Sequence, residues 1–134
     1  MRSRSAKNKG ARLQNEVRDL LLESFPSLEP DDIKCAIMGE SGEDIKLSPA
    51  ARRAIPYSIE CKNQEKISIW AALKQAEENC KVGTVPLLVF RRNNAETYAT
   101  IKMSDFLKLI KPSSTTPDES VIAPESGDIS EGFG

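Results

Sequence analysis

Two short segments in which charged and apolar residues alternate, residues 42–47 and 57–62, constrain this chain more than any other feature. Successive side chains of an extended strand point to opposite faces. Glu60 and Lys62 therefore share one face of the second strand, and Asp44 lies on the charged side of the first. If the strands are neighbours, two carboxylates and an ammonium group meet. Such a group binds a hard divalent cation beside a cationic side chain, which predicts hydrolysis of phosphodiester bonds.

The same acids also fit a plain structural role, as solvent-facing carboxylates on an edge hairpin. Two details favour a site. The segment 57–62 is flanked by apolar residues and leads into a helix, as a central strand does. A central strand that carries Glu60 and Lys62 must pair these charges or give them a metal, because burying a bare charge is costly.

The composition limits the chemistry that is available. The chain has 134 residues, of which 39% are hydrophobic, enough for one core and one domain. It has no histidine and no Cys-x-x-Cys pair, which excludes histidine catalysis and argues against structural zinc. The isolated cysteines fit a reducing cytoplasm. With no apolar run near the ~20 residues of a membrane span and no signal peptide, we expect a soluble protein without membrane contact.

The net charge of −1 hides a segregation of charge. The whole chain has 20 acids and 19 bases, and five acids but no base follow Pro112. Taking those five away leaves 15 acids, so the body carries an excess of about four bases. A basic segment before the first helix predicts a polyanionic partner. An ordinary solvated terminus is the alternative.

Hydrophobic periodicity predicts one α/β domain around a mixed sheet. Helices are expected at about residues 10–25, 69–81 and 105–111, the last two capped by Ser68 and Ser104. Strands are expected at residues 33–38, 43–47, 57–62, 85–90 and 97–101, with a polar connection after Ser48. We therefore divide the chain into a basic arm (1–9), a domain (10–111) and a disordered acidic tail (112–134). Trp70 and Tyr57 are expected in the core.

Two further polar residues lie near the inner faces of helices. Glu16 falls within the apolar side of the first helix, where it points toward the sheet or pairs with Arg12 at the helix edge. Gln75 falls near the inner edge of the second helix, although glutamine is also a common surface residue.

These features together resemble the PD-(D/E)XK nuclease superfamily, and within it the Holliday junction resolvase branch. The resemblance runs from about residue 10 to residue 110. It rests on Glu16, Asp44, the Glu60-Cys61-Lys62 signature, Trp70, Gln75 and the apolar strand 86–90. Glu43 stands where the family name has proline, a position that varies. The resemblance implies a restriction-endonuclease-like αβββαβ core, a mixed central sheet flanked by helices.

The resemblance also implies roles for the site residues. Asp44, Glu60 and the carbonyl of Cys61 would bind Mg²⁺ or Mn²⁺, which suit oxygen ligands. Lys62 would position or deprotonate the attacking water. Glu16 would hold a water on the metal or contribute to a second metal. Gln75 would orient Lys62 or the scissile phosphate.

For contact with DNA we expect the basic arm, two arginines beside the site and one serine in the turn before Asp44. These residues are Arg2, Arg4, Lys7, Lys9, Arg12, Ser41, Arg52 and Arg53. Arg91 and Arg92 either extend this surface or solvate a strand end. Contacts of this kind neutralise phosphates and read few bases.

The expected function is that of a Mg²⁺-dependent DNA endonuclease that resolves Holliday junctions in recombination and repair. We expect it to act as a homodimer. A phage or a mobile element would suit such a nuclease as its source. The alternatives are a nuclease of the same fold that cuts or nicks duplex DNA or DNA ends, and a nucleic-acid-binding module without catalysis. The acidic tail is either a solubilising linker, a competitor of DNA for the basic surface, or a contact for a protein partner.

Overall fold

The computed structural model describes residues 4–112, with side chains from residue 8 onward. The described residues fall into two units, the first ending at Lys102 and the second beginning at Met103. Arg2 and the expected disordered tail after residue 112 lie outside the described residues. Among the helices that are described, none combines the length and the apolar content that crossing a bilayer requires.

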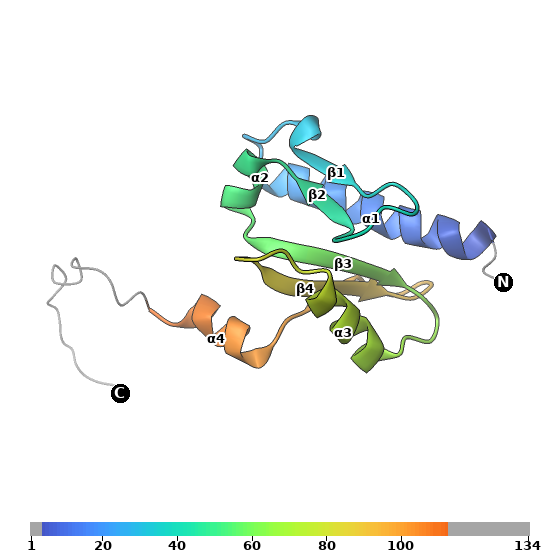
Figure 1. The fold of residues 1–134 in the computed structure, drawn as a ribbon. Helices are drawn as coiled ribbons and strands as arrows, with labels where there is room; N and C mark the ends of the chain where they lie inside the picture. Colours follow the sequence, from blue (N-terminus) through green and yellow to red (C-terminus); the bar gives the residue numbers. More distant parts are fainter. Residues whose placement is uncertain (1–3, 113–134) are drawn as a thin grey trace, which may run out of the picture. The chain divides into compact units, whose positions relative to one another are not determined.

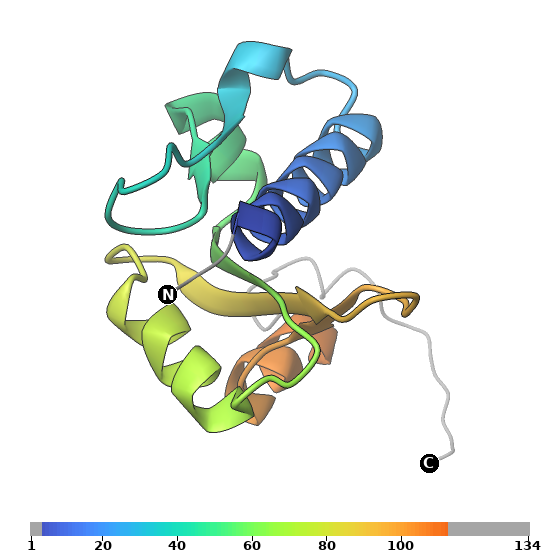
Figure 2. The same cartoon turned by 90° about the vertical axis from the view of Figure 1, so that its right-hand side faces the viewer.

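In the first unit, helices flank a two-stranded antiparallel sheet and a mixed three-stranded sheet (Figures 1 and 2). Its elements in chain order are α1 (Arg4–Ser24), η1 (Pro30–Asp32), β1 (Ile33–Cys35), β2 (Ile45–Leu47), α2 (Pro49–Ala54), β3 (Tyr57–Asn63), α3 (Ile69–Glu78), β4 (Val85–Arg91) and β5 (Tyr98–Thr100). Helix α1 covers one face and α3 the other. The expected α/β architecture is confirmed at this level.

The strands form two sheets, one of β1 and β2 and one in the order β3-β4-β5, so β3 lies at the edge of the three-stranded sheet. Strands β1 and β2 form an antiparallel hairpin. Strands β3 and β4 are parallel, with Glu60 opposite Leu88 and Cys61 opposite Val89, and α3 makes the crossover that a parallel pair needs. Strand β5 adds to β4 in the antiparallel sense. The hairpin meets β3 through Asp44.

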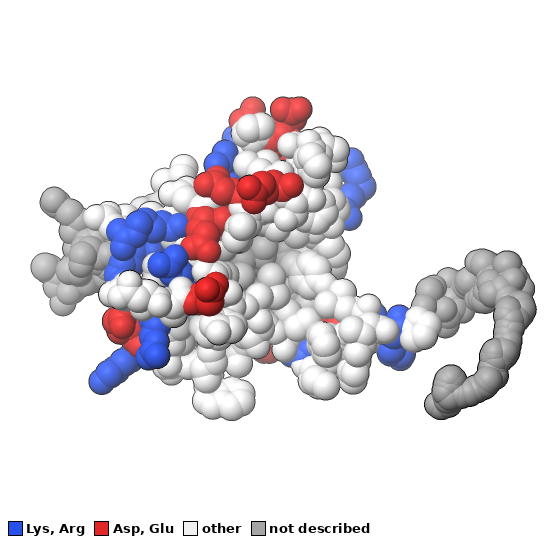
Figure 3. All heavy atoms as spheres, turned by 180° about the vertical axis from the view of Figure 1, so that it is seen from behind, with Lys and Arg blue, Asp and Glu red and all other residues white. Residues whose placement is uncertain are grey.

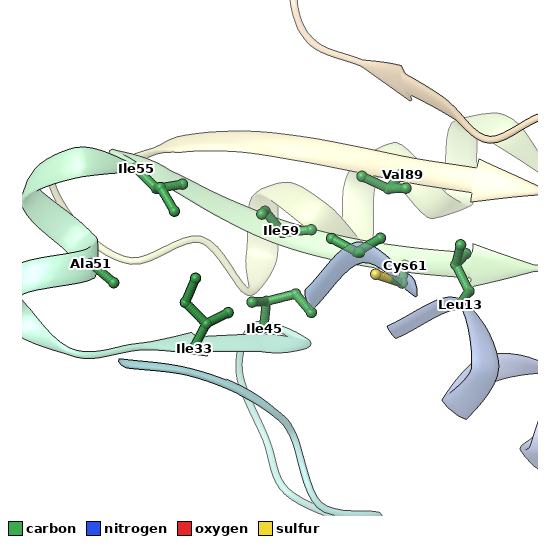
Figure 4. Close-up of a cluster of buried hydrophobic side chains, with 9 residues drawn as sticks. Leu13, Ile33, Ile45, Ala51, Ile55, Ile59, Cys61 and Val89 are labelled. Atoms are coloured by element: carbon green, nitrogen blue, oxygen red, sulfur yellow. The ribbon is translucent and has the colours of Figure 1, made fainter. Parts of the chain in front are cut away.

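The larger core lies between α1 and the sheet, as the helix periodicity predicts. Leu13, fully buried, and Val17 of α1 pack with side chains of the strands and of α2 (Figure 4). The Nε of Arg18 donates to the carbonyl of Ile33 at 2.9 Å and fixes the helix to β1. The helix starts at Arg4 and not near residue 10, so residues 4–9, expected as a basic arm, have a helical backbone.

The connection after β2 differs from the sequence expectation. Residues expected to form an irregular polar link form α2, with Pro49 in its first turn and Ser48 as the N-cap that accepts the N–H of Ala51 at 3.1 Å. Ser-Pro is a helix start as well as a turn signal. The buried Ala51 anchors this short helix to the core, which the low apolar content of the segment concealed.

Helix α3 packs through small residues. Ala72 and Ala76 lie against Leu88 of β4. Ser68 takes the N-cap position without a side-chain hydrogen bond. Trp70 is 80% exposed, so its expected place in the core was wrong. Trp70 precedes Ala72 by two residues, about 200° around the helix, so it faces away from the contact with the sheet.

The second unit contains α4 (Met103–Ile110) in its described part. The helix begins before Ser104, so the expected cap residue lies inside the first turn. Lys111 N–H donates to the carbonyl of Leu107 at 2.9 Å and closes the last turn. The sequence placed this helix in the domain 10–111, whereas the first compact unit ends at Lys102.

Candidate metal centre

Asp44 directly precedes β2 and links the hairpin to β3. We call this place the joint. The N–H of Asp44 donates to the carbonyl of Ile59 at 2.9 Å, and its own carbonyl accepts the N–H of Ala36 at 2.8 Å. Two residues further along β3, the N–H of Cys61 donates to the Oδ2 of Asp44 at 2.7 Å. Asp44 thus joins the hairpin to β3 through both its backbone and its side chain.

Cys61 has its thiol and its backbone in different surroundings. The thiol is buried in the core beneath α1, as expected, and burial raises the pKa of this thiol well above its usual value. It is therefore no nucleophile. The N–H and C=O of one strand residue point to the same edge. The carbonyl oxygen of Cys61 consequently lies on the open edge that carries the Asp44 carboxylate.

Glu60 and Lys62 lie on the opposite face of β3 from the thiol, as the alternation predicts. Glu60 is only 3% exposed. Its Oε2 lies 3.8 Å from the Nζ of Lys62, and its Oε1 accepts the Nδ2 of Asn79 at 3.2 Å. The carboxylate is thus held between one cation and one amide.

The pKa values of both carboxyl groups are raised. Burial raises the pKa of Asp44, against the hydrogen bond from Cys61 and the charges of Lys62 and Lys46. Burial, and then the negative charge of Asp44, raise the pKa of Glu60. The hydrogen bond from Cys61 places the Asp44 carboxylate at the residue next to Glu60 in β3. One further positive charge between them would relieve both effects.

The oxygen atoms present fit a hard divalent cation. Among the described residues, no three acidic or cysteine side chains form a metal-binding cluster. The candidate donors at the joint are the carboxylates of Asp44 and Glu60 and the carbonyl of Cys61. Mg²⁺ is commonly held by one or two carboxylates and keeps several waters, so this donor set suits it.

Two cavities flank the joint, and α1 borders both. One, of about 410 Å³, lies at the end of β3 and is lined by Lys9, Gly10, Cys61, Lys62, Asn63, Gln64 and Glu65. The other, of about 370 Å³, lies beside the β1–β2 loop and is lined by Gly10, Ala11, Gln14, Ala36, Ile37, Met38, Gly39, Glu40 and Asp44. A ligand thus reaches Asp44 from the side of the hairpin and Lys62 from the end of β3, while Glu60 lines neither cavity.

Glu16 is engaged away from the two acids. Its Oε1 accepts the Nη1 of Arg91 at 2.7 Å, and its Oε2 accepts the hydroxyl of Thr97 at 2.7 Å. It does point toward the sheet, as expected, and its partner is Arg91 instead of Arg12. The structure thus gives it a structural contact, and its expected role at the metal stays a prediction.

Gln75 and Asn79 lie one turn apart on the same side of α3. In the described part of the chain, no hydrogen bond joins the Gln75 side chain to Lys62, and the residue that reaches the site is Asn79. The sequence analysis missed Asn79. Its spacing of four residues from Gln75 indicates that both lie on the same side of the helix. Asn79 follows the last helical residue, however, where an asparagine usually indicates only the end of a helix.

The expected DNA-binding residues have different surroundings. Lys9 lines the cavity at the end of β3, and its Nζ lies 3.7 Å from Glu65. Arg12 and Arg53 are exposed. The carbonyl of Ser41 accepts the Nζ of Lys46 at 2.8 Å. Of Arg4 and Lys7 the structure describes only the helical backbone.

Arg52 is committed to the protein. Its Nη2 donates to the buried Glu43 at 2.5 Å, and its Nη1 donates to the carbonyl of Tyr57 at 2.8 Å. Glu43 is 2% exposed. The guanidinium thus ties the starts of the two site-bearing strands together.

Basic side chains gather at the end of the first unit where α1 begins, while acidic side chains run across the middle of the same face (Figure 3). Strand β3 ends on this side of the unit (Figure 1). A polyanion would meet the positive end first.

Comparisons with family models, with curated proteins and with solved structures found no match to this chain.

Proposed function

We propose that this chain is a Mg²⁺- or Mn²⁺-dependent DNA endonuclease of the PD-(D/E)XK superfamily, acting on branched DNA in the manner of a Holliday junction resolvase. The observation that supports the proposal is the Asp44 carboxylate bound to the N–H of Cys61, the residue between Glu60 and Lys62, whose side chains form an ion pair. The carbonyl of Cys61 lies on the same edge.

The order of elements supports the proposal. Leaving aside the short α2, the first unit runs helix, three strands, helix and strand, with β3 and β4 parallel. This is the order of the restriction-endonuclease-like core. The acids lie at the start of β2 and in the middle of β3, which is where the resemblance expects them.

The side chains divide the chemistry among them. A bound Mg²⁺ or Mn²⁺ would polarise the phosphate and lower the pKa of a water. Asp44 and Glu60 supply the negative charge that holds the cation. Lys62, whose side chain is 22% exposed, presents its ammonium group to the phosphate and offsets the charge that develops during attack. Asn79 fixes the orientation of Glu60.

Cleavage tests the proposal directly. The purified protein is incubated with a four-way junction, a flap, a linear duplex and single-stranded DNA of matched sequence, with Mg²⁺. We expect cutting of the junction, and a loss of at least about a hundredfold in rate for Asp44→Asn, Glu60→Gln and Lys62→Met. Glu78→Gln is the matched control, because Glu78 is an exposed acid on α3. Undiminished cutting by Glu60→Gln would contradict the proposal.

Metal binding separates the enzyme from a non-catalytic DNA-binding module. Titration calorimetry with Mn²⁺ should show binding that disappears in Asp44→Asn and persists in Glu78→Gln. DNA binding by the same variants should persist and weaken steeply with added salt, because it rests on phosphate contacts. DNA binding without any site-dependent metal binding would favour the module.

The homodimer remains part of the proposal, because two strands of a junction are cut symmetrically by a two-fold pair of sites. Sedimentation analysis with and without junction DNA tests it. A single protomer bound per junction would exclude symmetric cutting by a dimer.

A further inference from the structure

The loop between β1 and β2 ends in a turn with two large apolar side chains on its outside. Ile37 is 76% exposed and Met38 is 70% exposed. Neither lies in either buried hydrophobic cluster. Exposed aliphatic side chains side by side on a loop indicate contact with another molecule more than support of the fold.

Hydrogen bonds hold this turn in one shape. The N–H of Glu40 donates to the carbonyl of Ile37 at 2.8 Å, and the N–H of Ile37 donates to the Oε1 of Glu40 at 2.8 Å. Gly39 has φ +85°, a conformation that strains other residues. On the return side, Lys46 donates to the carbonyl of Ser41 at 2.8 Å. The two apolar side chains are therefore presented by a fixed turn, which loses little entropy on binding.

The turn forms one wall of the cavity that leads to the candidate metal centre. Ile37, Met38 and Asp44 line this cavity together, with Gly10 and Gln14 of α1 on the other side. A polymer whose backbone reaches Asp44 from the hairpin side must pass the turn. Any apolar surface of that polymer then lies against Ile37 and Met38.

We propose that Ile37 and Met38 form a wedge that inserts against the faces of unstacked DNA bases, so that the protein prefers DNA with a break in base stacking over continuous duplex. The inference rests on the proposed nuclease function and names its substrate class. Base faces are the apolar surface that DNA offers, and they are exposed where stacking is interrupted. Aliphatic side chains such as isoleucine and methionine are used in this way by proteins that kink DNA.

The test is the double variant Ile37→Ser/Met38→Ser, with Val82→Ser as the matched control. Val82 is also a fully exposed aliphatic residue, in the loop between α3 and β4. Both variants should keep the thermal stability of the parent protein. Binding to a four-way junction and to a linear duplex of the same composition is measured by anisotropy in metal-free buffer. A 2-aminopurine at the branch point reports unstacking.

We expect the double variant to lose about tenfold in junction affinity with little change in duplex affinity, and to lose the rise in 2-aminopurine fluorescence. Val82→Ser should behave as the parent. An unchanged junction preference and fluorescence in a double variant that still binds DNA would overturn the wedge alone. A change from dimer to monomer on sedimentation would overturn it in favour of a contact between two copies. A parent protein that binds no DNA would overturn the proposed function as well.

Discussion

Arg52 forms an ion pair with Glu43, the residue that directly precedes Asp44 in the chain, and the Glu43 side chain is only 1% exposed. The guanidinium also bonds the carbonyl of Tyr57, at the start of β3. One side chain therefore sets the spacing between the strands that carry the two site acids. Arg52, which the sequence predicts to contact DNA, thus supports the site from within, and its contact with DNA stays a prediction.

Removing this guanidinium should destabilise the fold. Arg52→Gln leaves the carboxylate of Glu43 buried without its cation, and we expect a loss of about 3 kcal/mol in the free energy of unfolding. Urea denaturation measures the loss. Arg53→Gln, one residue further on the same helix and exposed, is the control and should change stability little. Equal effects of the two variants would show that the ion pair contributes nothing.

Asn79→Ala should weaken metal binding without unfolding the protein. The amide holds one oxygen of Glu60, and without it the carboxylate turns more freely. We expect about a tenfold weaker affinity for Mn²⁺, in line with the loss of an outer partner of a metal ligand. Calorimetry measures the affinity, and Gln75→Ala is the control on the same helix. Unchanged affinity with lowered stability would make Asn79 a structural residue only.

The metal-free protein should become more stable when the site loses a charge. The pKa of Glu60 is raised in the folded state, so the stability that its protonated form contributes is complete at acid pH and is lost as pH rises through the raised pKa. Glu60→Gln removes this loss of stability, because glutamine does not ionise as pH rises. We therefore expect its Tm to exceed that of the parent at neutral pH, by a margin that shrinks on acidification.

Melting curves between acid and neutral pH, with a chelator present, check this expectation. Adding Mn²⁺ should reverse the order, because only the parent protein binds the cation in the folded state. A margin that is independent of pH would show that the ionisation of Glu60 does not govern the difference.

Glu16→Gln should affect stability more than metal binding. Glu16 joins α1 to the end of β4 through Arg91 and to Thr97, and its loss leaves Arg91 without its charged partner. We expect a cost of about 1–2 kcal/mol in unfolding free energy. Titration with Mn²⁺ decides between the roles, since a tenfold weaker affinity at unchanged stability would restore the catalytic role that the resemblance implies.

The sequence predicted the architecture and the central acids because both follow from short-range periodicity. Alternation alone puts Glu60 and Lys62 on one face of β3, and the spacing of Leu13 and Val17 orients α1 toward the core. The partners of these residues depend on tertiary contacts far apart in the chain. Asn79 reaches Glu60 across 19 positions and Arg91 reaches Glu16 across 75, distances that no local pattern encodes.

Other differences came from ambiguous local signals. Ser48 and Pro49 start a helix as readily as a turn, and the outcome was decided by the burial of Ala51. An aromatic residue such as Trp70 is usually buried, but here two alanines form the contact with the sheet. The sequence analysis did not foresee that Arg52 pairs with Glu43, which is a buried acid.

Because the Asp44 carboxylate accepts the backbone N–H of Cys61, the length of its side chain must match the distance between the hairpin and β3. A glutamate there has the same charge but one methylene more, so its oxygens overshoot the N–H of Cys61 or push the hairpin away from β3. Replacing aspartate by glutamate is usually a mild exchange, but at position 44 it would alter how the hairpin lies against β3.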